Sequence, residues 1–136
     1  MSLANVTESD SLDWVLKGTD PSWRAAATGY LALGAGVPDE ANPMAGELTY
    51  TGYARISMTK ATAWSGTGAS RTNAALLQWG KRTDAGATQT ATHAIWCDTA
   101  SGAVGMALII PLDDDLAISL NIRPQVEANG LTVTAE

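Results

Sequence analysis

The first hydrophobic pattern in the chain has the period of a helix. In residues 5–18, "NVTESDSLDWVLKG", the apolar residues Leu12, Val15 and Leu16 recur at helical spacing. Ser and Thr residues that can cap a helix precede them, and Gly18 follows them. The pattern therefore predicts a helix over about 8–17. A helix this short buries one narrow stripe, so this stripe must pack against something else.

Beyond the helix, apolar and polar residues alternate with a period of two, as in half-buried strands. Turn-forming residues interrupt the alternation at the spacing of all-β folds, and no helical crossovers separate the segments. We therefore expect an all-β protein, an antiparallel β-sandwich of jelly-roll type, with one N-terminal helix and a single domain over 1–136. The expected strands are 30–33, 53–58, 75–79, 92–97, 103–110, 116–122 and 131–135.

One long loop and two turns are expected between these strands. Residues 37–47 hold two prolines and three acids, which predicts a long surface loop. "DTASG" at 98–102 predicts a turn in which Asp98 accepts bonds from nearby backbone N–H groups. "PLDDD" at 111–115 predicts a turn before the last long strand. In that strand the residues expected to point inward are Leu116, Ile118, Leu120 and Ile122.

Composition narrows the class of protein. The chain has 136 residues, of which 46% are apolar and 16% charged, so it can bury a real core without a disulfide or a metal. Its net charge of −6 and scattered basic residues argue against nucleic acid and anionic membranes as partners. The longest apolar run, 103–110, is far shorter than the ~20 residues of a membrane helix. The N-terminus has no signal-peptide pattern.

The single histidine and the single cysteine raise the question of a reactive site. His93 and Cys97 lie four residues apart in "HAIWCD". On a strand they share a face but lie roughly 13 Å apart. A nucleophile and its base must approach within about 3 Å, so the pair forms neither a dyad nor half a metal site. We interpret Cys97 as a buried apolar residue and His93 as structural or exposed.

Other candidate chemistry is weak, so no catalytic residue, cofactor or metal is expected. The run Asp113-Asp114-Asp115 lacks the spacing, glycine and distal glutamate of an EF-hand, and a calcium site would need help from another loop. The glycine-rich stretches lack the following helix and lysine of a phosphate loop. A small hydrolase with two carboxylates that converge in space remains the enzymatic alternative.

Four of the five tryptophans are candidate interface residues: Trp14, Trp23, Trp64 and Trp79. Trp14 lies on the predicted helix but off its apolar stripe, and the other three lie in or beside loops. Aromatic residues at such positions can anchor a protein interface or stack on a carbohydrate. They can equally close the ends of the sandwich.

The order of motifs resembles a family of small tailed-bacteriophage virion proteins, described as tail-fibre-like or head-decoration proteins. The likeness covers most of the chain. Its best markers are "GYAR" at 52–55 and "DTASG" at 98–102. The other matching motifs are "LDWVLKG", "YLAL", Asn73 before a strand, Trp79-Gly80, "THAI" and a terminal "LTVT".

This resemblance implies a structural role in the virion and no catalytic residues. We expect a capsid decoration (cement) protein that binds the major capsid protein and copies of itself, with three-fold symmetry expected from that role. The alternative is a tail or baseplate component. It would contact tail proteins, or bind a host surface glycan through Trp23, Trp64 or Trp79.

Overall fold

The computed structural model describes residues 2–135 and confirms the all-β, sandwich-like fold with one N-terminal helix. The strands form three antiparallel sheets. The largest sheet has the spatial order β1 (Ser2–Leu3), β8 (Ala107–Ile118), β7 (Gln89–Cys97), β2 (Thr28–Gly34) and β3 (Ile56–Thr59). The others are β10 (Thr132–Thr134), β5 (Ser70–Asn73) and β4 (Trp64–Ser65), and the pair β6 (Leu77–Gln78) and β9 (Gln125–Val126). The helices are α1 (Asn5–Lys17) and α2 (Lys60–Ala63).

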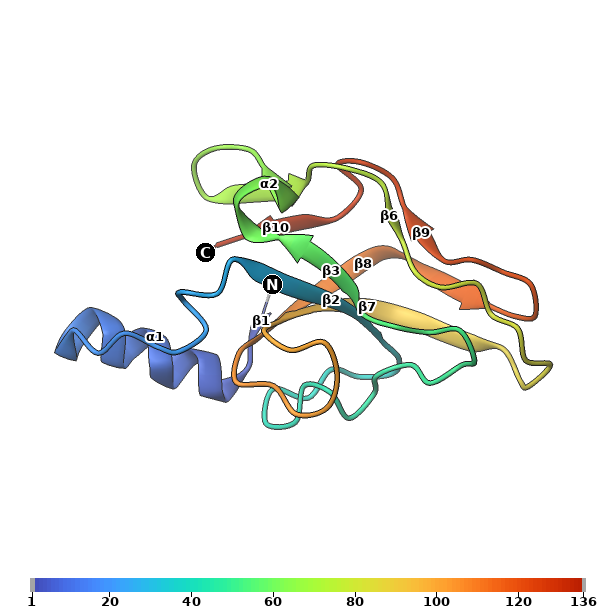
Figure 1. Cartoon of the computed structure of the whole chain (residues 1–136), viewed down its shortest axis with the longest axis horizontal. Helices are drawn as coiled ribbons and strands as arrows, with labels where there is room; N and C mark the ends of the chain where they lie inside the picture. The colour runs from blue at the N-terminus through green and yellow to red at the C-terminus, as the bar shows by residue number, and fades with distance from the viewer. Residues whose placement is uncertain (1, 136) are drawn as a thin grey trace.

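The main core lies between the five-stranded sheet and the two smaller sheets, which Figure 1 shows on one side of β2, β7 and β8. Leu31 and Leu33 of β2 point into it, and Ile110 of β8 joins them. Leu77 of β6 and Leu131, just before β10, close it on the side of the smaller sheets. Because side chains alternate along a strand, the intervening residues face the other side of the large sheet.

That second face carries a smaller cluster of mostly short side chains, covered by loops. The cluster comprises Ala4, Ala32, Ile95 and Ala107, with Met44 and Val104 packed against it. Met44 belongs to the predicted loop 37–47, which the structure confirms as a segment without helix or strand apart from a bridge at Glu47. Short side chains let these loops approach the sheet closely.

Several predicted strands have different limits. The segments at 30–33 and 92–97 lie within longer strands, β2 and β7. The strand predicted at 103–110 begins only at Ala107, because Gly105 and Met106 still belong to the turn that Asp98 holds. Of 53–58, only Ile56 to Met58 is strand, and Ala54 is exposed.

The turn predicted at 111–115 is wrong, since β8 runs through it. Pro111 pairs with His93 and Leu116 with Ala91, so β8 bulges between them. Proline is tolerated here because β1 pairs only with Leu108 and Ile109, which leaves Pro111 at a sheet edge where its missing N–H costs no ladder bond. The aspartates that follow are exposed along the same edge.

The inward positions predicted for Leu120 and Ile122 are also wrong. The strand ends at Ile118, and these two side chains are 46% and 43% exposed. A turn takes over, in which Asn121 adopts a left-handed conformation with φ 68° and the Ile122 N–H bonds the Ser119 carbonyl. Asparagine tolerates this conformation, so local turn chemistry overrides the alternation.

Helix α1 begins at Asn5, three residues before the predicted start, and no side chain caps it. The hydroxyl of Thr7, one of the Ser and Thr residues that could have capped the predicted helix, instead bonds across to β8. It accepts from the Ala107 N–H at 2.9 Å and donates to the Ala107 carbonyl. The predicted end is confirmed. Gly18 has φ 69°, and its N–H bonds the Trp14 carbonyl.

Candidate interaction surface

His93 and Cys97 lie on the extended strand β7, as predicted, and face separate neighbours. His93 pairs with Gly34 and Pro111, whereas Cys97 pairs with Tyr30 and Ala107. The His93 ring is buried over the backbone of Gly34, and its Nδ1 lies 2.9 Å from the Thr92 hydroxyl. Burial lowers the pKa of His93. These positions give the histidine a structural role.

Cys97 is a buried free cysteine, as interpreted from the sequence, but one of its contacts is charged. Its Sγ lies 3.8 Å from Nη1 of Arg55. Burial raises the pKa of the Cys97 thiol, and the nearby guanidinium lowers it in part. The raised pKa keeps the sulfur in its unreactive thiol form.

Arg55 joins the two motifs that carry the family resemblance. Its guanidinium bonds both Glu47 oxygens, at 2.7 and 2.8 Å. It also donates to the carbonyls of Thr99 and Gly102, at 2.9 and 2.8 Å. The arginine of "GYAR" thus holds the "DTASG" turn closed, and Asp98 completes that turn by accepting two backbone N–H groups, as predicted.

Sequence reasoning missed a second buried arginine. Arg82 donates to the Ala87 and Ile118 carbonyls, each at 2.8 Å, and pairs with Asp84. Its guanidinium and the backbone N–H of Thr51 hold the pKa of the Asp84 carboxyl well below its usual range. Residues 81–89 are mostly polar, and nothing in their local pattern reveals that an arginine reaches the end of β8.

These networks leave few buried polar groups available to bind a ligand or to react. Within residues 2–135, every buried side-chain nitrogen and oxygen has a hydrogen-bond partner. The same residues contain no group of three or more His, Cys, Asp or Glu side chains that could hold a metal ion. The bonds of Arg55 occupy all of its N–H donors, so this buried charge has none left for a ligand.

The four candidate tryptophans take different positions. Trp79 is 2% exposed and donates to the Leu31 carbonyl at 3.1 Å, so it lies in the core with no free ring face. Trp64 is half-buried and packs edge-on against Trp96 with ring centroids 5.4 Å apart. Trp23 is half-buried, and its indole nitrogen donates to Asp10 at 2.8 Å.

Trp14 is the most exposed of the four and belongs to an apolar surface on α1. The Arg24 guanidinium lies 4.9 Å from its ring centroid. On the same helix Leu12, Val15 and Leu16 are 59%, 72% and 75% exposed. Figure 1 shows α1 extending beyond the end of the sheets. The predicted stripe therefore exists, but it does not pack against the rest of its own chain.

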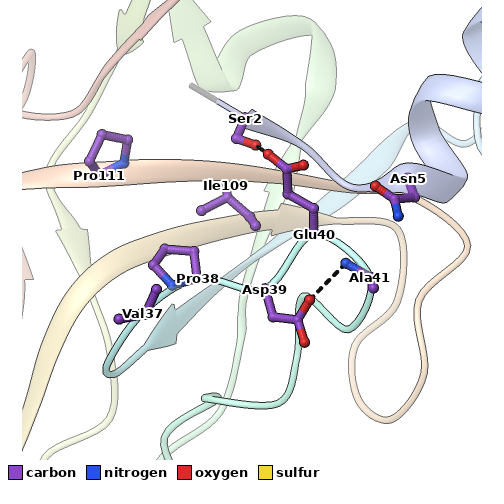
Figure 2. A pocket seen from close by; sticks show the side chains of 9 residues that line it. All are labelled: Ser2, Asn5, Val37, Pro38, Asp39, Glu40, Ala41, Ile109 and Pro111. Carbon is purple, nitrogen blue, oxygen red and sulfur yellow. Dashed lines mark hydrogen bonds between the residues drawn. The ribbon is translucent and has the colours of Figure 1, made fainter.

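A second surface feature is an open hollow of about 690 Å³ between the start of β1, the loop after β2 and the middle of β8. Figure 2 shows Val37 and Pro38 of the loop, Ile109 and Pro111 of β8, and Asn5 at the start of α1. Ser2 donates to Glu40, and the Asp39 carboxylate accepts the Ala41 N–H at 2.9 Å. Most of the lining is apolar, and the Asp39 and Glu40 carboxylates form part of it.

Comparison with known protein families matches residues 2–134 to the family described as Podophage GP4 fiber I protein gp80. A search of curated proteins found no match. No helix in residues 2–135 is long and apolar enough to span a membrane. Since the match covers nearly the whole chain, this protein belongs to that fibre-protein family and is a structural component of a phage virion.

Proposed function

We propose that this protein is a structural subunit of the phage tail, in or beside its fibres, and that it acts by assembling with other virion proteins. The observation that carries the proposal is the exposed stripe of Leu12, Val15 and Leu16 on α1. Apolar side chains gathered at one place on a surface mark an interaction site. The name of the family supports the location, because it describes a fibre protein of a podophage.

The bonding of the buried polar groups favours a role in assembly over a role in catalysis. The buried arginines bond carboxylates and backbone carbonyls that close the loops of the protein. The histidine and the cysteine lie in the body of the fold, where burial lowers the pKa of His93 and raises the pKa of Cys97. Both shifts favour the neutral form of the side chain. These groups stabilise a rigid body that can carry an interaction surface.

A capsid decoration protein that binds the major capsid protein is the second candidate. It is favoured by shape, because the described residues form stacked sheets with no repeating segment from which a long shaft could be built. Cryo-electron microscopy of the purified virion, with an antibody fragment against this protein as a marker, separates the two. Label on the tail supports the fibre proposal, and label confined to the shell overturns it in favour of decoration.

A receptor-binding version of the tail proposal has narrower support. Trp79 is buried, and Trp23 and Trp64 are half-buried and packed against other groups. Carbohydrate binding needs an open aromatic face, and Trp14 is the most exposed of the candidate rings. Glycan-array binding that is lost in Trp14→Ala and kept in Trp79→Phe would support a receptor role, and the absence of any glycan binding would contradict it.

A further inference from the structure

We infer that the hollow beside β1 and the stripe of α1 form one acidic and apolar surface, and that this surface binds the turn at residues 119–124 of a second copy of this chain. The contact is one form of the assembly proposed above and rests on that proposal. Three features of residues 2–135 carry it: the continuity of the surface, the sign of its charge, and a basic, apolar turn at the far end of the molecule.

The hollow continues into the stripe along one side of α1. With about 100° between successive residues of an α-helix, Asn5, which lines the hollow, falls within the arc of about 100° that contains the stripe. Figure 2 shows Asn5 at the start of the helix, beside the loop that carries Glu40 and Ala41. The stripe follows roughly 10–17 Å farther along the helix axis. Thr7, through which α1 is bonded to β8, lies about 130° from the centre of the arc, so this side of the helix faces away from β8.

Exposed apolar side chains lie at both ends of this surface. Val37 is 93% exposed at the hollow, and Pro38 and Pro111 beside it are exposed as well. Leu12 and Leu16 are exposed at the other end. Pro111 keeps a further strand from extending the sheet here, because it has no N–H to offer at the edge of β8. A partner therefore binds through its side chains, and the hollow of about 690 Å³ has room for them.

The charged groups on this surface, among the residues described, are all acidic. Glu8 falls within the same arc of the helix as the stripe, and Asp39 and Glu40 line the hollow. Lys17 lies about 150° from the centre of the arc, where it pairs with Asp13. Because the exposed carboxylates repel one another, a partner that brings basic groups is favoured over a neutral or acidic one.

The turn that follows β8 combines apolar and basic side chains. Leu120 and Ile122 are 46% and 43% exposed, and Arg123 is exposed next to them. Lys81 is exposed on the neighbouring segment, which is joined to the turn by a bond from the Arg82 N–H to the Ile122 carbonyl. This end of the molecule therefore offers the chemistry that the acidic surface selects.

Lys81 and Arg123 are also the bases that have no partner within the chain. The other six Lys and Arg residues each donate to a carboxylate or to a backbone carbonyl: Lys17, Arg24, Arg55, Lys60, Arg71 and Arg82. The ion pairs and side-chain hydrogen bonds found in residues 2–135 involve neither Lys81 nor Arg123. These two bases can therefore pair with carboxylates of another molecule without giving up a bond in their own.

The acidic surface and the basic turn meet only between copies. Figure 1 shows α1 projecting at one end of the molecule and the turn after β8 at the other end. Because the two surfaces are different, copies join head to tail and each copy uses both surfaces. The exposed acids Asp113, Asp114 and Asp115 are a less suitable target for the turn, since no exposed large apolar side chain lies among them.

Two charge reversals test the contact. Asp39→Lys/Glu40→Lys makes the hollow basic, and Lys81→Glu/Arg123→Glu makes the turn acidic. Light scattering at equal concentration should show that each variant alone has a mean mass at least two-fold below that of the wild type, because like charges then face each other. A 1:1 mixture of the two variants should recover the wild-type mass. In the mixture the basic hollow meets the acidic turn, and the unchanged hollow meets the unchanged turn.

Matched controls reverse the same number of charges at exposed positions outside the contact. Asp113→Lys/Asp114→Lys is the control for the hollow, and Lys17→Glu/Arg71→Glu is the control for the turn. Both should keep the wild-type mass, and circular dichroism checks that every variant is folded.

Disulfide trapping gives a second measurement without a change of charge. Val37→Cys protein mixed with Ile122→Cys protein should form a linked dimer under mild oxidation, and Val37→Cys mixed with Ser57→Cys should not. Both positions of the control are exposed, and the native Cys97 is buried.

Three outcomes would overturn the inference. They are a wild type that stays monomeric at the highest soluble concentration, a mixture of the reversed variants that does not recover the mass, and controls that lose as much mass as the test variants. Virion labelling is independent of all three. A failed recovery with label on the tail rejects this contact and leaves the proposed function standing, whereas recovery with label confined to the shell supports the contact and overturns the tail location.

Discussion

The body of this protein and its helix α1 differ in whether their side chains find partners within the chain. Around Arg55 a buried charge is fully bonded, to Glu47 and to the carbonyls of Thr99 and Gly102. On α1 the apolar side chains of Leu12 and Leu16 lie in water, and the helix touches β8 through a buried threonine. The polar groups of the first region find their partners within the chain, whereas the proposed function assigns a partner to the second.

Under the proposed function, this difference separates residues that stabilise the fold from residues that serve assembly. Exposed large apolar side chains concentrate on one short element, since five of the nine found in residues 2–135 belong to α1. Scattered surface apolar residues need no explanation, but a cluster does. We therefore expect substitutions in the body to change the free energy of unfolding, and substitutions in the stripe to change assembly.

The largest effect is expected at Arg55. Arg55→Met removes the guanidinium that pairs with Glu47 and donates to the Thr99 and Gly102 carbonyls, so the free energy of unfolding should fall by about 3–5 kcal/mol. Urea unfolding followed by tryptophan fluorescence measures it. Arg123→Met, at an exposed arginine, is the matched control and should cost less than about 0.5 kcal/mol. Equal losses in the two variants would contradict the role of the network.

A smaller loss is expected at Gly29 in β2. An added Cβ would lie 2.1 Å from the ring of Trp96, which is itself buried in the core. Gly29→Ala should therefore cost about 1–3 kcal/mol through overpacking. Thermal unfolding provides the measurement, and Ser57→Ala, on the exposed face of β3, is the control. If the alanine variant unfolds at the wild-type temperature, the packing described around Trp96 is incorrect.

Because of His93, we expect the free energy of unfolding to depend modestly on pH. Burial lowers its pKa, so the unfolded chain takes up a proton at a higher pH than the folded chain. The stability from neutral His93 is complete above about pH 6.5 and is lost as the pH falls toward the folded pKa, by at most about 1.4 kcal/mol per pH unit. Urea unfolding between pH 8 and pH 5 should show this slope. The slope should be smaller in His93→Gln, and an unchanged slope would assign it to other groups.

Sequence patterns predicted the fold class, β2, β7 and the C-terminal end of α1 because these depend on local signals. Alternation identifies a half-buried strand. A glycine such as Gly18 can end a helix whatever the distant segments of the chain do. The patterns failed where distant segments decide the outcome. Pro111 was predicted to lie in a turn. A strand can pass through it because β1 is too short to pair with this part of β8.

The candidate surface shows the same limit. The stripe of Leu12, Val15 and Leu16 was visible as a period, but no period says which molecule covers it. The sequence marked both Trp79 and Trp14 as candidate interface residues, yet one lies in the core and the other is exposed. Their difference arises from the packing of β6 and α1, which local patterns do not contain. The networks of Arg55 and Arg82 were missed for the same reason.

The most direct test of the central claim is the unfolding free energy of Leu12→Ser/Leu16→Ser, measured in dilute solution where copies are separate. Leu31→Ala, at a fully buried position of β2, sets the scale with an expected loss of about 2–5 kcal/mol. If the stripe contributes to contacts between molecules and not to its own fold, the double variant should stay within about 0.5 kcal/mol of the wild type. A loss comparable with that of Leu31→Ala would show that the stripe stabilises its own chain, and would contradict the account.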